Sequence, residues 1–234
     1  MKAVRIVFRK ELHELLASRS SVVTGVGFVL FFGAMYSIRV FADQAAGLEQ
    51  SLSSVLFFLS SLLGVFLGYT LTSQVFLREK MDAVIETLLS APVRLGEIWL
   101  GKTAAVTAFA SLLAIGAALL MSVVVSLRAG SLAFVSPAVA FHVVVGVPLL
   151  TACLVGALGF VQLLLGMKEN RIIGLALFIP IFAGLYGLGY TSAGTLEVSW
   201  REVLLVSLGA GLVLAVLLRA ARRISKERIV TSLP

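Results

Sequence analysis

The sequence predicts an all-α polytopic membrane protein, and its composition and the grouping of its apolar residues support this prediction. Hydrophobic residues make up 59% of the 234 residues and charged residues only 13%, whereas soluble domains hold roughly 45–50% and about 25%. The mean hydropathy is +1.06. The apolar residues are grouped into runs of the length that a spanning helix needs, which is about 20 residues. Because lipid offers backbone groups no hydrogen bonds and the alternation of a barrel is absent, we expect helices.

Six apolar segments have the length and composition of spans, within a single membrane domain covering residues 1–234. The first and the last of them are short but carry no charged residue. The predicted spans are Ser21–Ile38, Leu52–Phe76, Ile98–Leu127, Pro137–Gly166, Ile172–Tyr190 and Val203–Leu218.

Basic residues are distributed very unevenly between the predicted loops. With the N-terminus inside, 16 of the 19 Lys and Arg fall in the cytoplasmic segments, and only Arg39, Arg128 and Arg201 fall outside. Positive charge is retained on the cytoplasmic side of membrane proteins. We therefore expect a multi-pass protein of the cell membrane with both termini cytoplasmic, which needs an even number of spans. This orientation accounts for the net charge of +7 without a nucleic-acid partner.

The first 19 residues are predicted to form an amphipathic helix lying in the cytoplasmic interface of the bilayer. Its apolar residues recur at helical spacing, and charged residues occupy the other face; a solvated basic tail is the alternative. The apolar positions are Val4, Phe8, Leu12 and Leu15 or Leu16, and the charged ones are Arg5, Arg9, Lys10, Glu11 and Glu14.

The cytoplasmic segment Leu77–Glu97 is predicted to contain a short amphipathic helix. Val84 and Leu88 form one apolar pair at i, i+4 spacing, and Ile85 and Leu89 form another. Proline disfavours helix at the residue before it, so this helix should end before Pro92. The alternative is a solvated loop that packs on the ends of the spans.

No catalytic or metal-binding constellation is found. The chain lacks a GxxxxGK[ST] phosphate-binding loop and an HExxH motif, its single cysteine is Cys153, and His13 and His142 have no companion ligands. We therefore expect neither a metal site nor enzyme activity. No Asp, Glu, Lys or Arg lies within the spans away from their ends, which disfavours an ion-coupled carrier. Gly64 and Gly68 form a GxxxG motif, which packs helices within the chain or between two copies.

Two stretches of the sequence resemble a known family. The first runs Phe76-Leu77-Arg78-Glu79-Lys80-Met81-Asp82-Ala83-Val84-Ile85-Glu86-Thr87-Leu88-Leu89-Ser90-Ala91-Pro92-Val93 and is followed by Ile98-Trp99-Leu100-Gly101-Lys102; the second is Phe8-Arg9-Lys10-Glu11-Leu12. They resemble the cytoplasmic loop and the interfacial helix of ABC transporter permeases of the type-2 exporter family. The residues that match the loop pattern are Glu86, Leu88, Leu89, Pro92, Gly101 and Lys102, while Ala91 stands where a hydroxyl residue is usual.

The resemblance implies a transport subunit that forms the translocation pathway as a dimer, with an identical or a different second permease copy. It also implies a separate ATP-binding subunit, which would hold the ATP and Mg²⁺ that this chain lacks motifs to bind. The short helix in Leu77–Glu97 would be the coupling element that docks this partner. The residues expected to contact the partner are Arg78, Glu79, Lys80, Glu86, Leu88, Leu89 and Pro92.

Two other functions stay open. A membrane scaffold or assembly factor that moves no substrate would use the same loop to dock a different partner. An ion-coupled secondary carrier is disfavoured because the spans hold no buried carboxylate.

Overall fold

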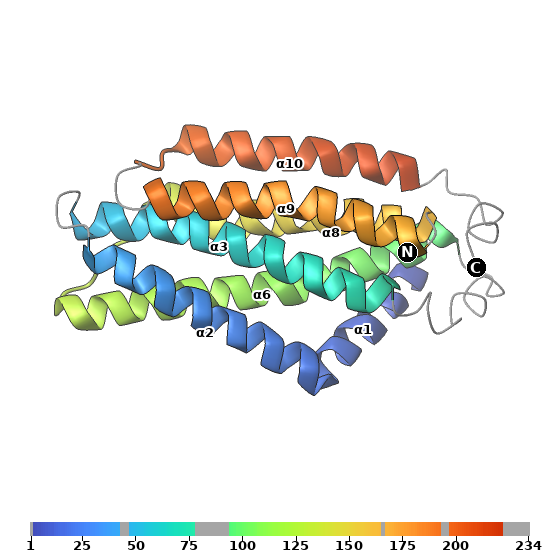
Figure 1. Cartoon of the computed structure of the whole chain (residues 1–234), viewed down its shortest axis with the longest axis horizontal. Helices are drawn as coiled ribbons and strands as arrows, with labels where there is room; N and C mark the ends of the chain where they lie inside the picture. Colours follow the sequence, from blue (N-terminus) through green and yellow to red (C-terminus); the bar gives the residue numbers. More distant parts are fainter. Residues whose placement is uncertain (1, 43–46, 78–93, 165–166, 193–196, 222–234) are drawn as a thin grey trace.

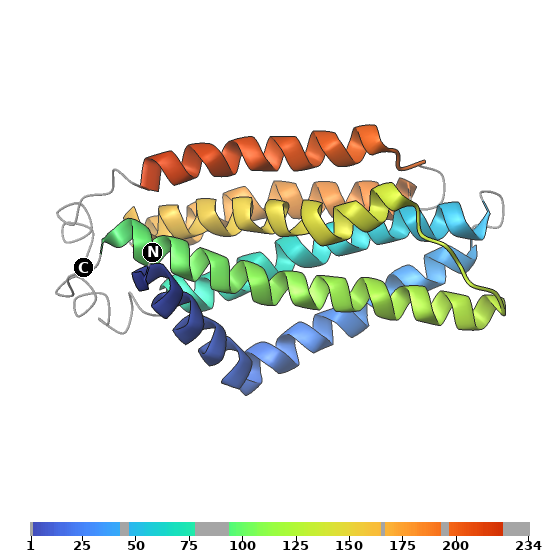
Figure 2. The ribbon, with the colours of Figure 1, turned by 180° about the vertical axis from the view of Figure 1, so that it is seen from behind.

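The computed structural model of the chain describes residues 2–42, 47–77, 94–164, 167–192 and 197–221. The long helices lie side by side along one axis, and only the first is strongly inclined, so that α1 and α2 form a V (Figures 1 and 2). In chain order the elements are α1 Lys2–Ala17, α2 Arg19–Ala42, α3 Leu48–Thr72, the π-helical turn η1 Ser73–Leu77, α6 Leu95–Ala129, α7 Pro137–Phe141, the π-helical turn η2 His142–Gly146, α8 Val147–Leu164, α9 Met167–Ser192 and α10 Trp200–Ala221.

The prediction of an all-helical fold is confirmed for the described residues, all of whose regular elements are helices. Five helical segments in this part of the chain are long and apolar enough to cross a membrane, and Ile172–Gly187 within α9 is a shorter apolar helix. The five are Arg19–Ile38, Leu48–Phe76, Leu95–Ala129, Pro137–Leu164 and Trp200–Ala221. That all six predicted segments span the bilayer stays a prediction.

The centre of the bundle is α3, which packs against α2, α6, α8 and α9. Of its most apolar 18-residue window, which lies within Leu48–Phe76, 94% is buried inside the protein. A helix that is apolar on all sides is suited to such a position. Its small residues allow close packing: a Cβ added at Gly64 would lie 2.5 Å from Thr151 Oγ1 and 2.9 Å from Val147 Cγ1 of α8. The structure thus uses the GxxxG face for packing within one chain.

The two ends of the bundle differ. The start of α1, η1, the start of α6 and the end of α10 gather at one end, which we call the terminal end (Figures 1 and 2). The end of α6 and the start of α10 lie at the opposite end, where the helices carry Arg128 and Arg201. With 35 residues, α6 is about 52 Å long and exceeds a hydrocarbon core of about 30 Å. Its termini therefore extend beyond the apolar thickness of a bilayer.

Candidate functional site at the terminal end

The predicted partner-docking residues lie outside the described part of the chain. They are Arg78, Glu79, Lys80, Glu86, Leu88, Leu89 and Pro92. The structure does describe the elements on either side of them, η1 and the start of α6, together with the α1 helix that packs there. These elements form the site described below.

Close packing of α1 against α6 depends on Gly101. A Cβ at this position would lie 2.8 Å from Val7 Cβ and Cγ1, and 3.0 Å from the backbone oxygen of Val4. Contacts this short are not found for real Cβ atoms, so only glycine lets the two helices approach to this distance. The close approach brings the next residue of α6, Lys102, within reach of α1.

Lys102 and Glu11 form a buried ion pair between α6 and α1. The ammonium nitrogen Nζ of Lys102 lies 2.8 Å from Oε1 of Glu11, and the two side chains are only 3% and 4% exposed. A second cation, Lys10, lies 3.4 Å from the same oxygen, but its side chain is 52% exposed. A buried charge is costly unless it is paired, so the fold depends on both members of the Glu11–Lys102 pair.

The expectation that Glu11 belongs to the exposed charged face of the first helix is wrong. Arg9 and Lys10 are exposed, but Glu11 is only 3% exposed. The reason is that α1 packs along α6, and the α1 stripe that meets α6 runs through Val7, Glu11 and Leu15. The observed stripe is one residue out of register with the predicted one, and one residue corresponds to about 100° around a helix. This rotation turns the charged Glu11 toward α6.

The η1 turn, which immediately precedes the predicted coupling segment, is tied to the same site. Nζ of Lys102 lies 5.8 Å from the centre of the Phe76 ring, within the range of a cation–π interaction. The Phe76 ring in turn packs on α8 at Gly159, where an added Cβ would lie 2.8 Å from Cζ. The hydroxyl of Ser21 in α2 donates a 2.9 Å hydrogen bond to Oε1 of Gln74. Three helices, α2, α6 and α8, therefore contact the residues that lead into the coupling segment.

We name the Glu11–Lys102 pair with Gly101 and Phe76 the terminal junction. Sequence reasoning did not pair Glu11 with Lys102, which are 91 residues apart. A signal was available, because each of the two family-like stretches carries one of these residues, and their charges are opposite. The helical register needed to bring them together depends on tertiary packing.

A second polar contact lies inside the bundle, between α3 and η2. The fully buried His142 has Nε2 2.8 Å from the hydroxyl of Ser61, and its ring packs on Phe57 at 4.3 Å between ring centres. The backbone N–H of Val147 donates to the carbonyl of His142, five residues earlier, which is the hydrogen bond of a π-helix. The next residue, Pro148, has no N–H and donates no backbone hydrogen bond. No group of three or more His, Cys, Asp or Glu in the described residues is placed to hold a metal ion.

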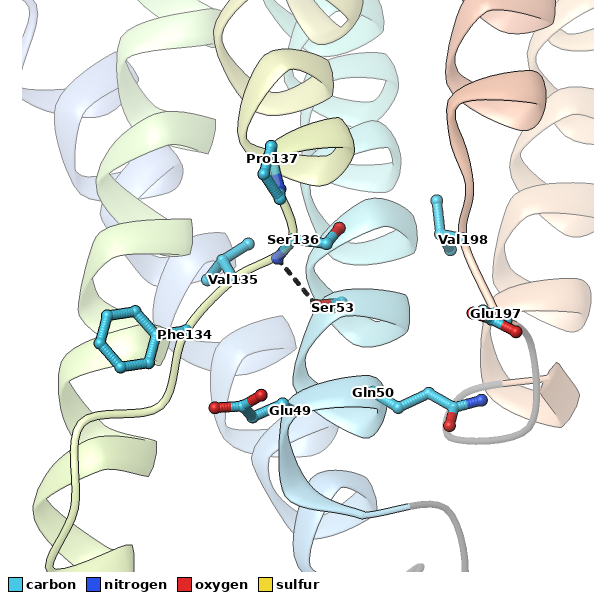
Figure 3. A pocket seen from close by; sticks show the side chains of 9 residues that line it. All are labelled: Glu49, Gln50, Ser53, Phe134, Val135, Ser136, Pro137, Glu197 and Val198. Atoms are coloured by element: carbon cyan, nitrogen blue, oxygen red, sulfur yellow. Dashed lines mark hydrogen bonds between the residues drawn. The ribbon is translucent and has the colours of Figure 1, made fainter.

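The opposite end of the bundle carries a cavity of about 370 Å³ between the start of α3, the segment before α7 and the segment before α10 (Figure 3). The backbone N–H of Ser136 donates a 3.3 Å hydrogen bond to the Ser53 hydroxyl and fixes the wall of this cavity. Glu49 and Glu197 line it from two different elements.

The fold and the site define an all-helical protein with several apolar helices compatible with a multi-pass membrane protein. No family model, curated protein or solved structure matches the chain.

Proposed function

We propose that this chain is the membrane-spanning permease subunit of an ATP-driven ABC exporter. It would form the translocation pathway as a dimer and dock separate ATP-binding subunits through Leu77–Glu97. The observation that carries the proposal is the terminal junction, in which the two stretches that resemble such permeases meet. Lys102 of the Gly-Lys pair and Glu11 of the Lys-Glu-Leu stretch form an ion pair of 2.8 Å.

The arrangement of the helices supports a membrane orientation with both termini in the cytoplasm. Five helices are long and apolar enough to cross a membrane, and if the shorter Ile172–Gly187 also crossed it, the chain would make six passes, an even number. Three basic residues occur where helices start or finish at the terminal end: Lys2, Arg94 and Arg219. Arg128 and Arg201 occur at the opposite end. Cytoplasmic loops retain positive charge, so the terminal end would face the cytoplasm, where ATP is found.

The terminal junction offers a physical route from the docking segment to the spans. A force on Leu77–Glu97 would act on η1 at one end of the segment and on the start of α6 at the other. Phe76 and Gln74 connect η1 to α8 and α2, and Lys102 connects α6 to α1. Packed helices move as rigid elements, so a shift of the docking segment would displace several spans together.

Copurification with an ATP-binding subunit tests the proposal. The full chain would be expressed with an ATP-binding subunit encoded beside it, purified as a complex and reconstituted in proteoliposomes. We expect a stable complex whose ATP hydrolysis changes when the permease is present, and substrate movement that requires ATP. A complex that hydrolyses ATP but moves no substrate would support the scaffold alternative, and the absence of a complex would exclude the exporter.

Replacing Glu86 and Leu89 together by alanine is expected to weaken partner docking or uncouple ATP hydrolysis while membrane insertion stays normal. A docked amphipathic helix places its apolar anchors in the partner's groove, so the loss of one anchor and one charge should lower the affinity about tenfold. Affinity and permease-stimulated ATPase activity are the measurements. Asp82→Asn, which alters a charge outside the matched pattern, is the control. Full coupling in the double variant would remove this segment from the mechanism.

A further inference from the structure

The side of α1 that points away from the bundle is basic. On the opposite side, Val4, Val7 and Glu11 of α1 meet Gly101 and Lys102 of α6. A basic residue stands two positions before each of these three α1 residues. Two positions turn an α-helix by about 200°, which is nearly its opposite side. We call these three basic residues, all of them exposed, the basic face of α1: Lys2, Arg5 and Arg9.

The two acidic residues of α1 do not compensate for this charge, since each already has a basic partner. Glu11 is buried in its pair with Lys102, and Oε1 of Glu14 lies 3.4 Å from Nζ of Lys10. Within the described part of the chain, by contrast, no hydrogen bond or ion pair holds the residues of the basic face. The basic face therefore carries positive charge that the described protein does not neutralise.

The packing of α1 on α6 fixes the direction in which the basic face points. A Cβ at Gly101 would lie 2.8 Å from Val7 Cβ, so the two helices are in direct contact there. The 2.8 Å ion pair between Glu11 and Lys102 fixes the rotation of α1 about its own axis. A different rotation would break this pair and leave a buried charge without its partner, which is costly. The basic face is therefore held away from the bundle.

The V formed by α1 and α2 places the basic face beside the expected boundary of a bilayer. The candidate span of α2, Arg19–Ile38, has 20 residues and is about 30 Å long, which matches a hydrocarbon core of about 30 Å. From the vertex of the V, α2 runs to the opposite end of the bundle and α1 runs obliquely to the terminal end (Figures 1 and 2). A bilayer that covers this span would therefore end at the vertex, where α1 ends at Ala17. Arg9 precedes Ala17 by about 12 Å along the inclined helix, so it would lie within roughly a Debye length of the headgroups.

We propose that the basic face of α1 binds the headgroups of anionic phospholipids in preference to those of zwitterionic phospholipids. Arginine forms charge-assisted hydrogen bonds with phosphate, and an anionic membrane surface attracts basic residues that lie within a Debye length of it. Ile6 and Leu16, which are 69% and 53% exposed on the same side of α1, would add apolar contact at the edge of the acyl region. The helix would thus meet the membrane through its charged side, because Leu12 and Leu15 of the predicted apolar stripe pack into the bundle. The inference does not rest on the proposed ATP-driven function, since it involves neither the docking segment nor a partner subunit.

Fluorescence quenching in nanodiscs tests this preference on the purified full-length chain. A fluorophore is attached to Ala17→Cys, an exposed position at the end of α1, in a Cys153→Ala background that removes the single native thiol. The quenchers are phosphatidylglycerol and phosphatidylcholine, each with an unmodified headgroup and a nitroxide near the start of one acyl chain. At about 0.1 M salt we expect phosphatidylglycerol to associate with α1 about fivefold more strongly, because one basic residue near an anionic surface contributes about this factor. The preference should be nearly lost at about 1 M salt, where the Debye length is about 3 Å.

Three double variants test whether the basic face causes the preference. Arg5→Gln/Arg9→Gln should bring the association of the two lipids close to equality, whereas quenching by phosphatidylcholine should persist and show that α1 keeps its place. Arg5→Lys/Arg9→Lys keeps both charges and should retain most of the preference. The matched control Arg128→Gln/Arg201→Gln removes two exposed arginines from the opposite end and should leave the preference at Ala17 unchanged.

Three outcomes would overturn the proposal. The first is equal quenching by the two lipids when all arginines are present. The second is a preference that survives in Arg5→Gln/Arg9→Gln. The third is the absence of quenching by either lipid, because the basic face would then be turned from the membrane toward a soluble partner.

Discussion

Replacing Lys102 by methionine is expected to lower the free energy of unfolding by about 3 kcal/mol, because it leaves the Glu11 carboxylate buried without its closest partner. The two side chains are 3% and 4% exposed, and the distance between Nζ and Oε1 is 2.8 Å. Methionine keeps most of the apolar stem of lysine and removes the charge. Denaturant titration in mixed micelles measures the change, and limited proteolysis shows whether α1 is released from α6.

Lys10 provides a matched control for this experiment, because it approaches the same carboxylate oxygen. Its Nζ lies 3.4 Å from Oε1 of Glu11, but its side chain is 52% exposed. Exposed ion pairs contribute roughly 0–1 kcal/mol, so Lys10→Met should have a small effect. If Lys10→Met and Lys102→Met lowered the free energy of unfolding equally, the burial of the Glu11–Lys102 pair would not explain its contribution to stability.

The double variant Glu11→Leu/Lys102→Met separates stability from function. Apolar replacement of both members of a buried ion pair is often neutral or stabilising, so most of the stability lost in Lys102→Met should return. If the terminal junction also transmits movement, as the proposed function requires, this stable double variant should still show reduced coupling between ATP hydrolysis and transport. Normal coupling would limit the ion pair to a structural role.

Replacing Gly64 by valine is expected to destabilise the bundle by about 2–3 kcal/mol, because the new side chain would collide with α8. Its Cβ would lie 2.5 Å from Thr151 Oγ1 and 2.9 Å from Val147 Cγ1, and these short β-branched side chains have little freedom to move. The measurement is the free energy of unfolding in mixed micelles. Since the face belongs to the packing within one chain, loss of stability should not depend on protein concentration.

Gly211→Val is the control for the Gly64 substitution. A Cβ at Gly211 in α10 would have nothing within 4 Å, so the same change of residue should be tolerated. Should Gly64→Val keep the monomer stable and instead dissociate a dimer, the GxxxG motif would act between copies, contrary to its position against α8.

Much of the fold could be predicted because membrane helices are encoded locally. A run of apolar residues has to be helical wherever it lies in lipid. Both α6 and the continuous helical run Pro137–Leu164 of α7, η2 and α8 follow their predicted segments closely. The helix at the N-terminus was also predicted from spacing alone. Its environment was not, because the apolar stripe of α1 was assigned to lipid, whereas the structure packs this helix on Gly101 and Lys102.

The candidate site could be predicted only in part. The family-like stretches identified Glu11 and Lys102 as residues of interest. Their pairing, however, requires that α1 packs closely on α6 and that both helices are rotated so that these two side chains face each other.

By itself, the sequence determined that this protein is helical and rich in segments long and apolar enough to cross a membrane, and it determined how unevenly the basic residues are distributed between those segments. Composition and short-range periodicity are sufficient for these properties, because they depend on the transfer of local segments into lipid. Only the tertiary structure decided that α3 is the central helix, that Glu11 is buried against Lys102, and that Phe76 of η1 packs on α8. These features depend on the rotation and spacing of helices far apart in the chain, which many side-chain contacts determine together.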